Sequence, residues 1–213
     1  MINDELQKSL YQMGRVVMLG VRELMGQAGV NAVANVANRP GMANLLAEDE
    51  SGVGRYDDIS SVQTALEVLY GPRGGKGVAL RVGRASFKFF IRQFGEQMGL
   101  TKLDYRLLPT QPRLKVGLQA MAATFTSLYA GAVDIAEDEE AWFWQMKNCP
   151  WCISRTVPTS DSTQQGACHY LVGMLQEFLA WASGGKIYSV REVECTAEGQ
   201  PGCIFRIEKL PLE

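Results

Sequence analysis

The segment VECTAEGQPGCIF, at residues 193–205, constrains the fold of this 213-residue chain more than any other stretch. Two short apolar runs flank a polar turn that contains glycine, with Cys195 on one side and Cys203 on the other. A turn this short joins antiparallel strands, so the segment predicts a β-hairpin. The alternating segment at residues 132–149 predicts a second pair of strands around an acidic turn.

Helical periodicity dominates the rest of the chain, where apolar residues recur at steps of three and four. The expected helices cover residues 3–28, 60–71, 75–99, 113–131 and 161–185, the last with its cap at Asp161, Ser162 or Thr163. Helices followed by two strands, a helix and two more strands predict an α+β fold with an antiparallel sheet. We expect residues 1–50 to form an N-terminal helical extension, with possible dimerisation, and residues 51–213 to form the main domain.

Charge and composition exclude several classes of function. The net charge of -2 argues against nucleic acid as a direct partner, because phosphate contacts need a basic surplus. No apolar run reaches the length of about 18 residues that a membrane span requires. The first residues include Asp4 and Glu5 and do not resemble a secretory signal, so we expect a cytoplasmic protein with reduced thiols.

The cysteines lie close together in the sequence, and they favour a metal site. All five fall within one third of the chain, at Cys149, Cys152, Cys168, Cys195 and Cys203. Thiolates gathered in a reducing compartment suit zinc, and Glu192 is an additional candidate ligand three residues before Cys195. Two alternatives are thiols that only fill the core and a redox pair in CPWC. His169 is the only histidine, which excludes sites built on several histidines.

Three motifs carry a resemblance to a known family. NCPWC, GACHYLVGMLQEFL and REVECTAEGQPGCIFRI resemble the 4-vinyl-reductase-like, or hydrocarbon-binding, domains over residues 135–208. Those domains are similar to the sensor domains of phenol- and xylene-responsive activators and, more distantly, to TRAPP-type tethering subunits. The resemblance implies a homodimer with a four-stranded antiparallel sheet packed against helices and an apolar pocket. It also implies zinc bound by Cys168, Glu192, Cys195 and Cys203, with Cys149 or Cys152 replacing Cys168 or Glu192 as a variant set.

Aromatic and sulfur side chains provide candidates for the pocket wall. Their spacing places them on one strand face and on one helix, at Trp142, Trp144, Tyr170, Met174 and Phe178. Ordinary core packing is the alternative for each of them. We expect a protein that binds a small hydrophobic or aromatic molecule and holds a structural zinc. An enzyme is less expected, because no dinucleotide-binding motif follows a predicted strand. The alternative function is a part in vinyl-group reduction during bacteriochlorophyll synthesis.

Overall fold

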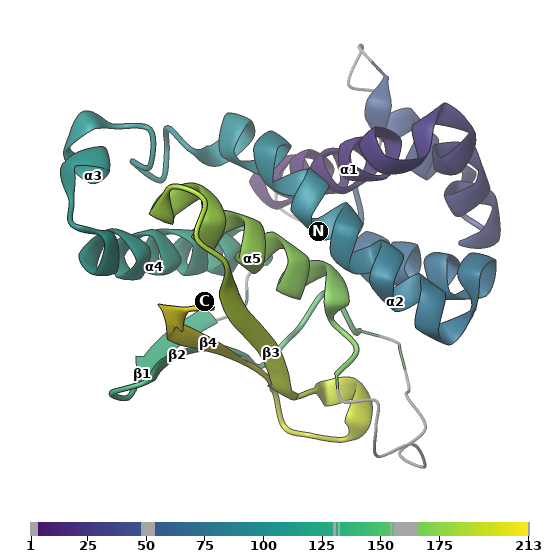
Figure 1. The fold of residues 1–213 in the computed structure, drawn as a ribbon. Coiled ribbons are helices and arrows are strands. Elements are labelled where there is room, and N and C mark those ends of the chain that lie inside the picture. The colour runs from purple at the N-terminus through teal and green to yellow at the C-terminus, as the bar shows by residue number, and fades with distance from the viewer. Residues whose placement is uncertain are drawn as a thin grey trace.

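Helices cover one face of a small antiparallel sheet (Figure 1). The structure is a computed structural model and describes residues 4–47, 54–129, 131, 133–153, 155 and 166–212. Its helices are α1 (Asp4–Val36), the 3-10 helix η1 (Pro40–Leu46), α2 (Asp58–Phe94), α3 (Leu103–Leu107), α4 (Thr110–Tyr129), α5 (His169–Ser183) and the 3-10 helix η2 (Thr196–Glu198). Its strands are β1 (Val133–Glu137), β2 (Ala141–Met146), β3 (Tyr188–Glu194) and β4 (Cys203–Pro211). The predicted α+β fold is confirmed.

The sheet joins the two predicted hairpins side by side. Its strand order is β1-β2-β4-β3, and each neighbouring pair is antiparallel. The two hairpins meet where β2 pairs with β4, with Met146 opposite Cys203 and Trp144 opposite Phe205. This non-local pairing sets the position of every group at the site described below.

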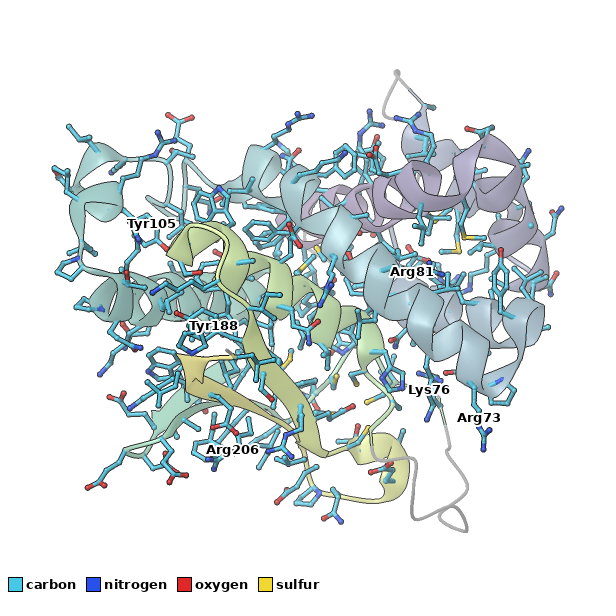
Figure 2. All side chains as sticks on the ribbon, viewed as in Figure 1. Arg73, Lys76, Arg81, Tyr105, Tyr188 and Arg206 are labelled. Atoms are coloured by element: carbon cyan, nitrogen blue, oxygen red, sulfur yellow. The ribbon has the colours of Figure 1, made fainter. Side chains whose placement is uncertain are left out.

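Only one face of the sheet is buried, as the alternating sequence pattern requires. Trp144, Phe205 and Tyr188 are buried, and Trp144 contacts Phe125 of α4. Arg206 lies on the opposite side of the sheet from Tyr188 (Figure 2). Helix α4 packs against β1 and α5 packs against β3, so these two helices form the layer next to the sheet. Helix α2 packs on α5, and α1 packs on α2.

Two glycines bend the long helices. Gly26 in α1 and Gly71 in α2 have φ angles of 68° and 74°, and glycine takes this left-handed conformation without a steric penalty. Pro72 follows Gly71, so the helical hydrogen bonds are also interrupted there. Element α2 therefore consists of two helical segments that meet at a kink at Gly71, where the sequence predicted the end of the helix at residues 60–71. Among the described residues, no helix has both the length and the apolar character needed to cross a membrane.

The crossing of α2 and α5 depends on two other glycines. A Cβ built on Gly83 would lie 2.0 Å from the carbonyl oxygen of Tyr170, and one built on Gly173 would lie 2.0 Å from that of Leu80. The absence of side chains lets the two backbones touch, which fixes α5 against α2. The start of α5 is thereby held at the end of the sheet where the cysteines gather.

Candidate metal centre

All five cysteines are buried, and three separate segments bring them together. Cys149 and Cys152 belong to the loop after β2, Cys168 precedes α5, and Cys195 and Cys203 flank η2. The pairing of Met146 with Cys203 explains the meeting, because the loop starts directly beyond Met146 and so begins beside Cys203.

The distances between the sulfur atoms suit a shared metal ion. The Sγ–Sγ distance is 3.4 Å for Cys149 and Cys168, and it is also 3.4 Å for Cys152 and Cys203. Cys203 lies 4.0 Å from Cys168 and 3.9 Å from Cys195. Sulfur ligands about 2.3 Å from a tetrahedral zinc ion lie roughly 3.8 Å apart, so these separations match the edges of such a tetrahedron. They are too long for disulfides, whose sulfur atoms are about 2.05 Å apart.

The potential ligands form two groups of four that overlap. One group holds Cys149, Cys152, Cys168 and Cys203, and the other holds Cys168, Glu192, Cys195 and Cys203. Within each group the ligand atoms all lie within 4.8 Å of one another. The second group is the set that the family resemblance implied. The first shows that the CPWC cysteines also reach the cluster, a question that the sequence left open.

Glu192 links the cluster to the start of α5. Its Oε2 accepts hydrogen bonds from the backbone N–H groups of Ala167 (2.7 Å) and Cys168 (2.8 Å), the two residues directly before α5. The side-chain cap expected near residue 161 lies outside the described residues, and α5 begins at His169. The other oxygen, Oε1, is buried and has no hydrogen-bond partner within the part of the chain that the structure describes. Burial raises the pKa of Glu192, against the opposing hydrogen bond from Cys168.

Without a cation, burial favours the neutral form of two of the thiols, whereas hydrogen bonds from neighbouring thiols, Cys149 first, lower the pKa of Cys152. Burial raises the pKa of both Cys149 and Cys168. A bound metal reverses the preference, because the ion stabilises the thiolate directly. Thr196 orients two of the sulfur atoms: its N–H donates to Cys203 Sγ at 3.4 Å, and its hydroxyl lies 2.9 Å from Cys152 Sγ.

His169 adjoins the cluster in sequence and belongs to neither group of potential ligands. Burial, followed by the charges of Lys76 and Arg155, lowers the pKa of His169 to about 4. The ring is therefore neutral at physiological pH.

The five predicted pocket residues are all buried, and they lie in the helix–sheet core. Trp142 donates its indole N–H to Glu137 Oε2 at 3.2 Å, near the edge of the sheet. Trp144 meets Phe125 of α4 edge to face, with 5.6 Å between the ring centroids. On α5, Tyr170, Met174 and Phe178 are fully buried, and Phe178 packs against Phe87 of α2.

The sequence interpretation missed three residues at the centre of this core, which are Gln63, Phe125 and Trp151. The ring of Phe125 contacts Trp151 at 5.1 Å and stacks on Phe90 at 5.3 Å. The amide of Gln63, on α2, donates to the carbonyl of Trp151 and accepts the N–H of Tyr170 at 2.9 Å. The position of Trp151 between the CPWC cysteines was the one available signal. Helical periodicity gave no reason to single out Gln63 or Phe125.

Two indole groups in this core lack a partner. Trp144 Nε1 and Trp151 Nε1 are buried, and no described residue accepts a hydrogen bond from them. Both belong to rings that touch Phe125. An unpaired buried donor costs about 1–3 kcal/mol, so these groups mark a place where a bound molecule could supply acceptors.

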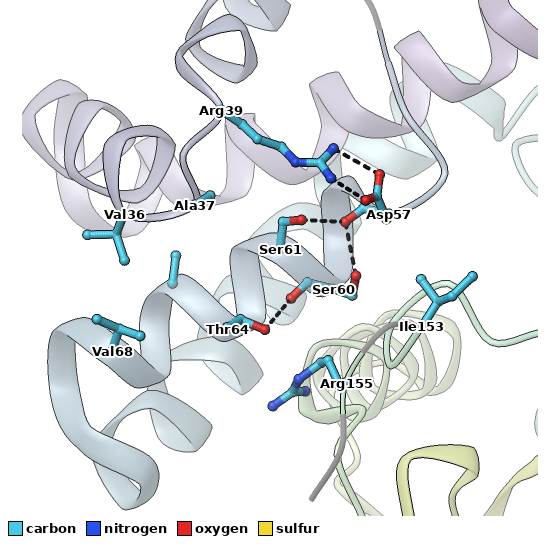
Figure 3. A pocket seen from close by; sticks show the side chains of 11 residues that line it. Val36, Ala37, Arg39, Asp57, Ser60, Ser61, Thr64, Val68, Ile153 and Arg155 are labelled. Atoms are coloured by element: carbon cyan, nitrogen blue, oxygen red, sulfur yellow. Dashed lines mark hydrogen bonds and ion pairs between the residues drawn. The ribbon is translucent and has the colours of Figure 1, made fainter.

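A separate surface pocket has a different character (Figure 3). Its volume is about 240 Å³, and its walls come from the end of α1, the start of α2 and the loop after β2. Its polar groups already satisfy one another: Arg39 pairs with Asp57, whose carbonyl accepts the hydroxyls of Ser60 and Ser61 at 3.0 and 2.8 Å. These bonds lie at the start of α2 and leave the groups engaged with the protein.

Comparisons with known proteins give a match in structure only. No protein-family model matches the chain, and neither does any curated protein sequence. Solved structures do match. One, described under "Probing the function of heme distortion in the H-NOX family", is 14% identical over 95% of each chain, with a TM-score of 0.54. An Fe(II) unliganded H-NOX protein from K. algicida is 10% identical over 92% of this chain and 95% of its own, with a TM-score of 0.53. The fold is shared.

A third match is weaker. The phenol-responsive sensory domain of the transcription activator PoxR, with phenol, is 14% identical over 84% of this chain and 88% of its own, and its TM-score is 0.45.

The haem named for one H-NOX structure does not fit the residues found here. Haem iron needs an axial ligand, such as a proximal histidine, beside a flat cavity, and His169, the sole histidine, lies next to the thiol cluster at the start of α5. The space between α4 and the sheet is filled by ring contacts of Phe125 with Phe90, Trp144 and Trp151. We therefore derive no haem chemistry for this chain.

Proposed function

We propose that this chain is a sensory domain that binds a small hydrophobic or aromatic molecule, and that its thiol cluster holds a structural zinc. The unpaired indole donors of Trp144 and Trp151 inside an aromatic core carry the proposal. A small ligand would enter by moving these packed rings apart; the rings would then supply apolar contacts, and the donors would select a ligand that presents an acceptor, such as a hydroxyl or carbonyl oxygen.

The likeness to H-NOX proteins agrees with this role at the level of the fold. One of those structures is described as Fe(II) unliganded, so the same arrangement of helices and sheet serves a protein with a ligand site. In this chain the aromatic core replaces the haem as the proposed place of binding.

A structural role for the zinc follows from the ligand count. Each group of potential ligands supplies four protein atoms, which complete a tetrahedron and leave no position for a substrate. The ion would tie the loop after β2, the start of α5 and the β3–β4 hairpin together. The predicted homodimer, the cytoplasmic location and a part in vinyl-group reduction stay predictions.

Tryptophan fluorescence tests the proposed ligand site. We expect phenol to change the emission of the zinc-loaded protein in a saturable way, and toluene, which has no acceptor, to bind more weakly. Because the ligand would accept a hydrogen bond from Trp151, Trp151→Phe should raise the Kd for phenol about tenfold, which equals about 1.4 kcal/mol. Trp181→Phe is the matched control, since Trp181 is 38% exposed and outside the core of unpaired donors.

An unchanged emission with phenol, in protein shown to be folded by circular dichroism, would contradict the proposed ligand chemistry. Equal affinities for phenol and toluene would contradict the role of the unpaired donors.

A further inference from the structure

We infer that the cluster holds two zinc ions, bridged by the thiolates of Cys168 and Cys203. This inference rests on the proposed zinc site and adds a second ion to it. The two groups of four potential ligands share Cys168 and Cys203, whose sulfur atoms lie 4.0 Å apart. Two tetrahedra that share an edge have this composition: two bridging ligands and two terminal ligands on each side.

The terminal ligands form two matched pairs. Cys149 and Cys152 are three residues apart in the loop after β2, and Glu192 and Cys195 are three residues apart at the end of β3. Neither member of one pair belongs to the other pair's group. Each pair is therefore a compact two-ligand unit that faces the shared Cys168–Cys203 edge from its own side.

A single ion would leave buried polar groups unused. An ion in the first group leaves Cys195 without a role and Glu192 Oε1 buried and unpaired among the described residues. An ion in the second group leaves Cys149 and Cys152 as spare thiols, although Cys149 lies 3.4 Å from Cys168 and Cys152 lies 3.4 Å from Cys203. Two ions use all six groups, and the second ion would pair with the buried Oε1 of Glu192.

The balance of charge also favours the second ion. Five thiolates and one carboxylate carry six negative charges, and two dications bring four positive ones, so two negative charges remain. One dication among four thiolates leaves the same two negative charges, and the ionised Glu192 beside it would add a third. The second ion therefore neutralises a buried carboxylate without raising the net charge of the cluster.

Metal counting tests the inference directly. The full chain is saturated with zinc, freed of excess metal by gel filtration and analysed by native mass spectrometry and elemental analysis. We expect two zinc ions per chain. Glu192→Gln and Cys195→Ser should each keep one ion, because the Cys149, Cys152, Cys168 and Cys203 set stays complete. Glu194→Gln is the matched control, one residue from Cys195 and outside both groups, and should keep two ions.

Cobalt gives an independent measurement on the unaltered chain and remains decisive if a variant fails to fold. We expect thiolate-to-cobalt absorption to saturate at two equivalents. The electron paramagnetic resonance signal per cobalt should fall as the second equivalent binds, because ions joined by shared sulfur atoms couple magnetically.

The outcomes separate the two proposals. One zinc per chain, with cobalt absorption saturating at one equivalent, would overturn the two-ion inference and leave the single structural zinc in place. No retained zinc would overturn both. Two ions without any loss of signal per cobalt would overturn the bridge.

Discussion

Gly173 of α5 lies against the main-chain carbonyl of Leu80 in α2, so near that a Cβ on Gly173 would be 2.0 Å from that oxygen. Gly83 of α2 has the reciprocal relationship with the carbonyl of Tyr170. Both obstructing atoms belong to helix backbone and cannot rotate away as a flexible side chain would. The α2–α5 contact therefore has almost no tolerance for added volume.

Gly173→Ala should destabilise the protein by about 1–3 kcal/mol, because the two helices must separate to admit the methyl group. Urea unfolding of the zinc-loaded protein measures the change. Gly77→Ala is the matched control, since Gly77 is a helical glycine of α2 and a Cβ there meets nothing within 4 Å. That change should raise stability by up to about 1 kcal/mol through helix propensity. Equal effects at the two positions would contradict the close-contact explanation.

Gln63→Leu should lower the free energy of unfolding by at least about 2 kcal/mol, because it leaves the carbonyl of Trp151 and the N–H of Tyr170 unpaired. Gln93→Leu makes the same chemical change at an exposed position of α2 and should be nearly neutral. Denaturant midpoints of the two variants provide the comparison. A neutral Gln63→Leu would mean that other groups or water satisfy both backbone atoms.

Asp138 should make stability depend on pH in the acid range. Its Oδ1 accepts the backbone N–H groups of Ala141 (2.7 Å) and Glu140 (2.8 Å) in the β1–β2 turn, and these bonds lower the pKa of Asp138. The stabilisation is complete above the unfolded-state pKa of about 3.9 and is lost as pH falls through the lower folded-state pKa.

Asp138→Asn keeps the acceptor oxygen and removes the titration, so it isolates this effect. The stability difference between wild type and variant should shrink as pH falls below about 4. Acid also releases metal from thiolates, but that loss is common to both proteins and cancels in the difference. A difference that stays constant with pH would contradict the prediction.

Removal of zinc should loosen one part of the molecule before the rest. The N–H groups of Ala167 and Cys168 bond to Glu192, and that of Thr196 bonds to Cys203, so their geometry depends on the cluster. After chelation we expect these amides to lose protection in hydrogen exchange while the amides of α1 keep theirs. Uniform loss of protection along the chain would show that the metal supports the whole fold equally.

Local patterns were sufficient to predict the hairpins and most of the helices. Strand alternation correctly put Trp142 and Trp144 on one face, because this periodicity depends on adjacent residues alone. The glycine at position 71 also marked a true interruption of the helical path.

The site was harder to predict, because its groups depend on contacts between distant segments. No sequence pattern shows that β2 pairs with β4, and that pairing decides whether Cys149 and Cys152 meet Cys203. Helix α5 begins at His169, later than predicted, and the acceptor for the N–H of Tyr170 in its first turn comes from Gln63 on α2. Gln63 was missed for the same reason.

The pairing of Met146 with Cys203 makes metal occupancy a check on strand alignment. A slip of one residue between β2 and β4 would turn Cys203, Phe205 and Ile207 to the solvent side of the sheet. In that alignment the cluster loses a sulfur ligand. A bound ion therefore stabilises the correct pairing of β2 with β4 relative to the slipped one. Zinc starvation would then raise the population of misaligned chains with exposed apolar strands, and we expect those chains to aggregate.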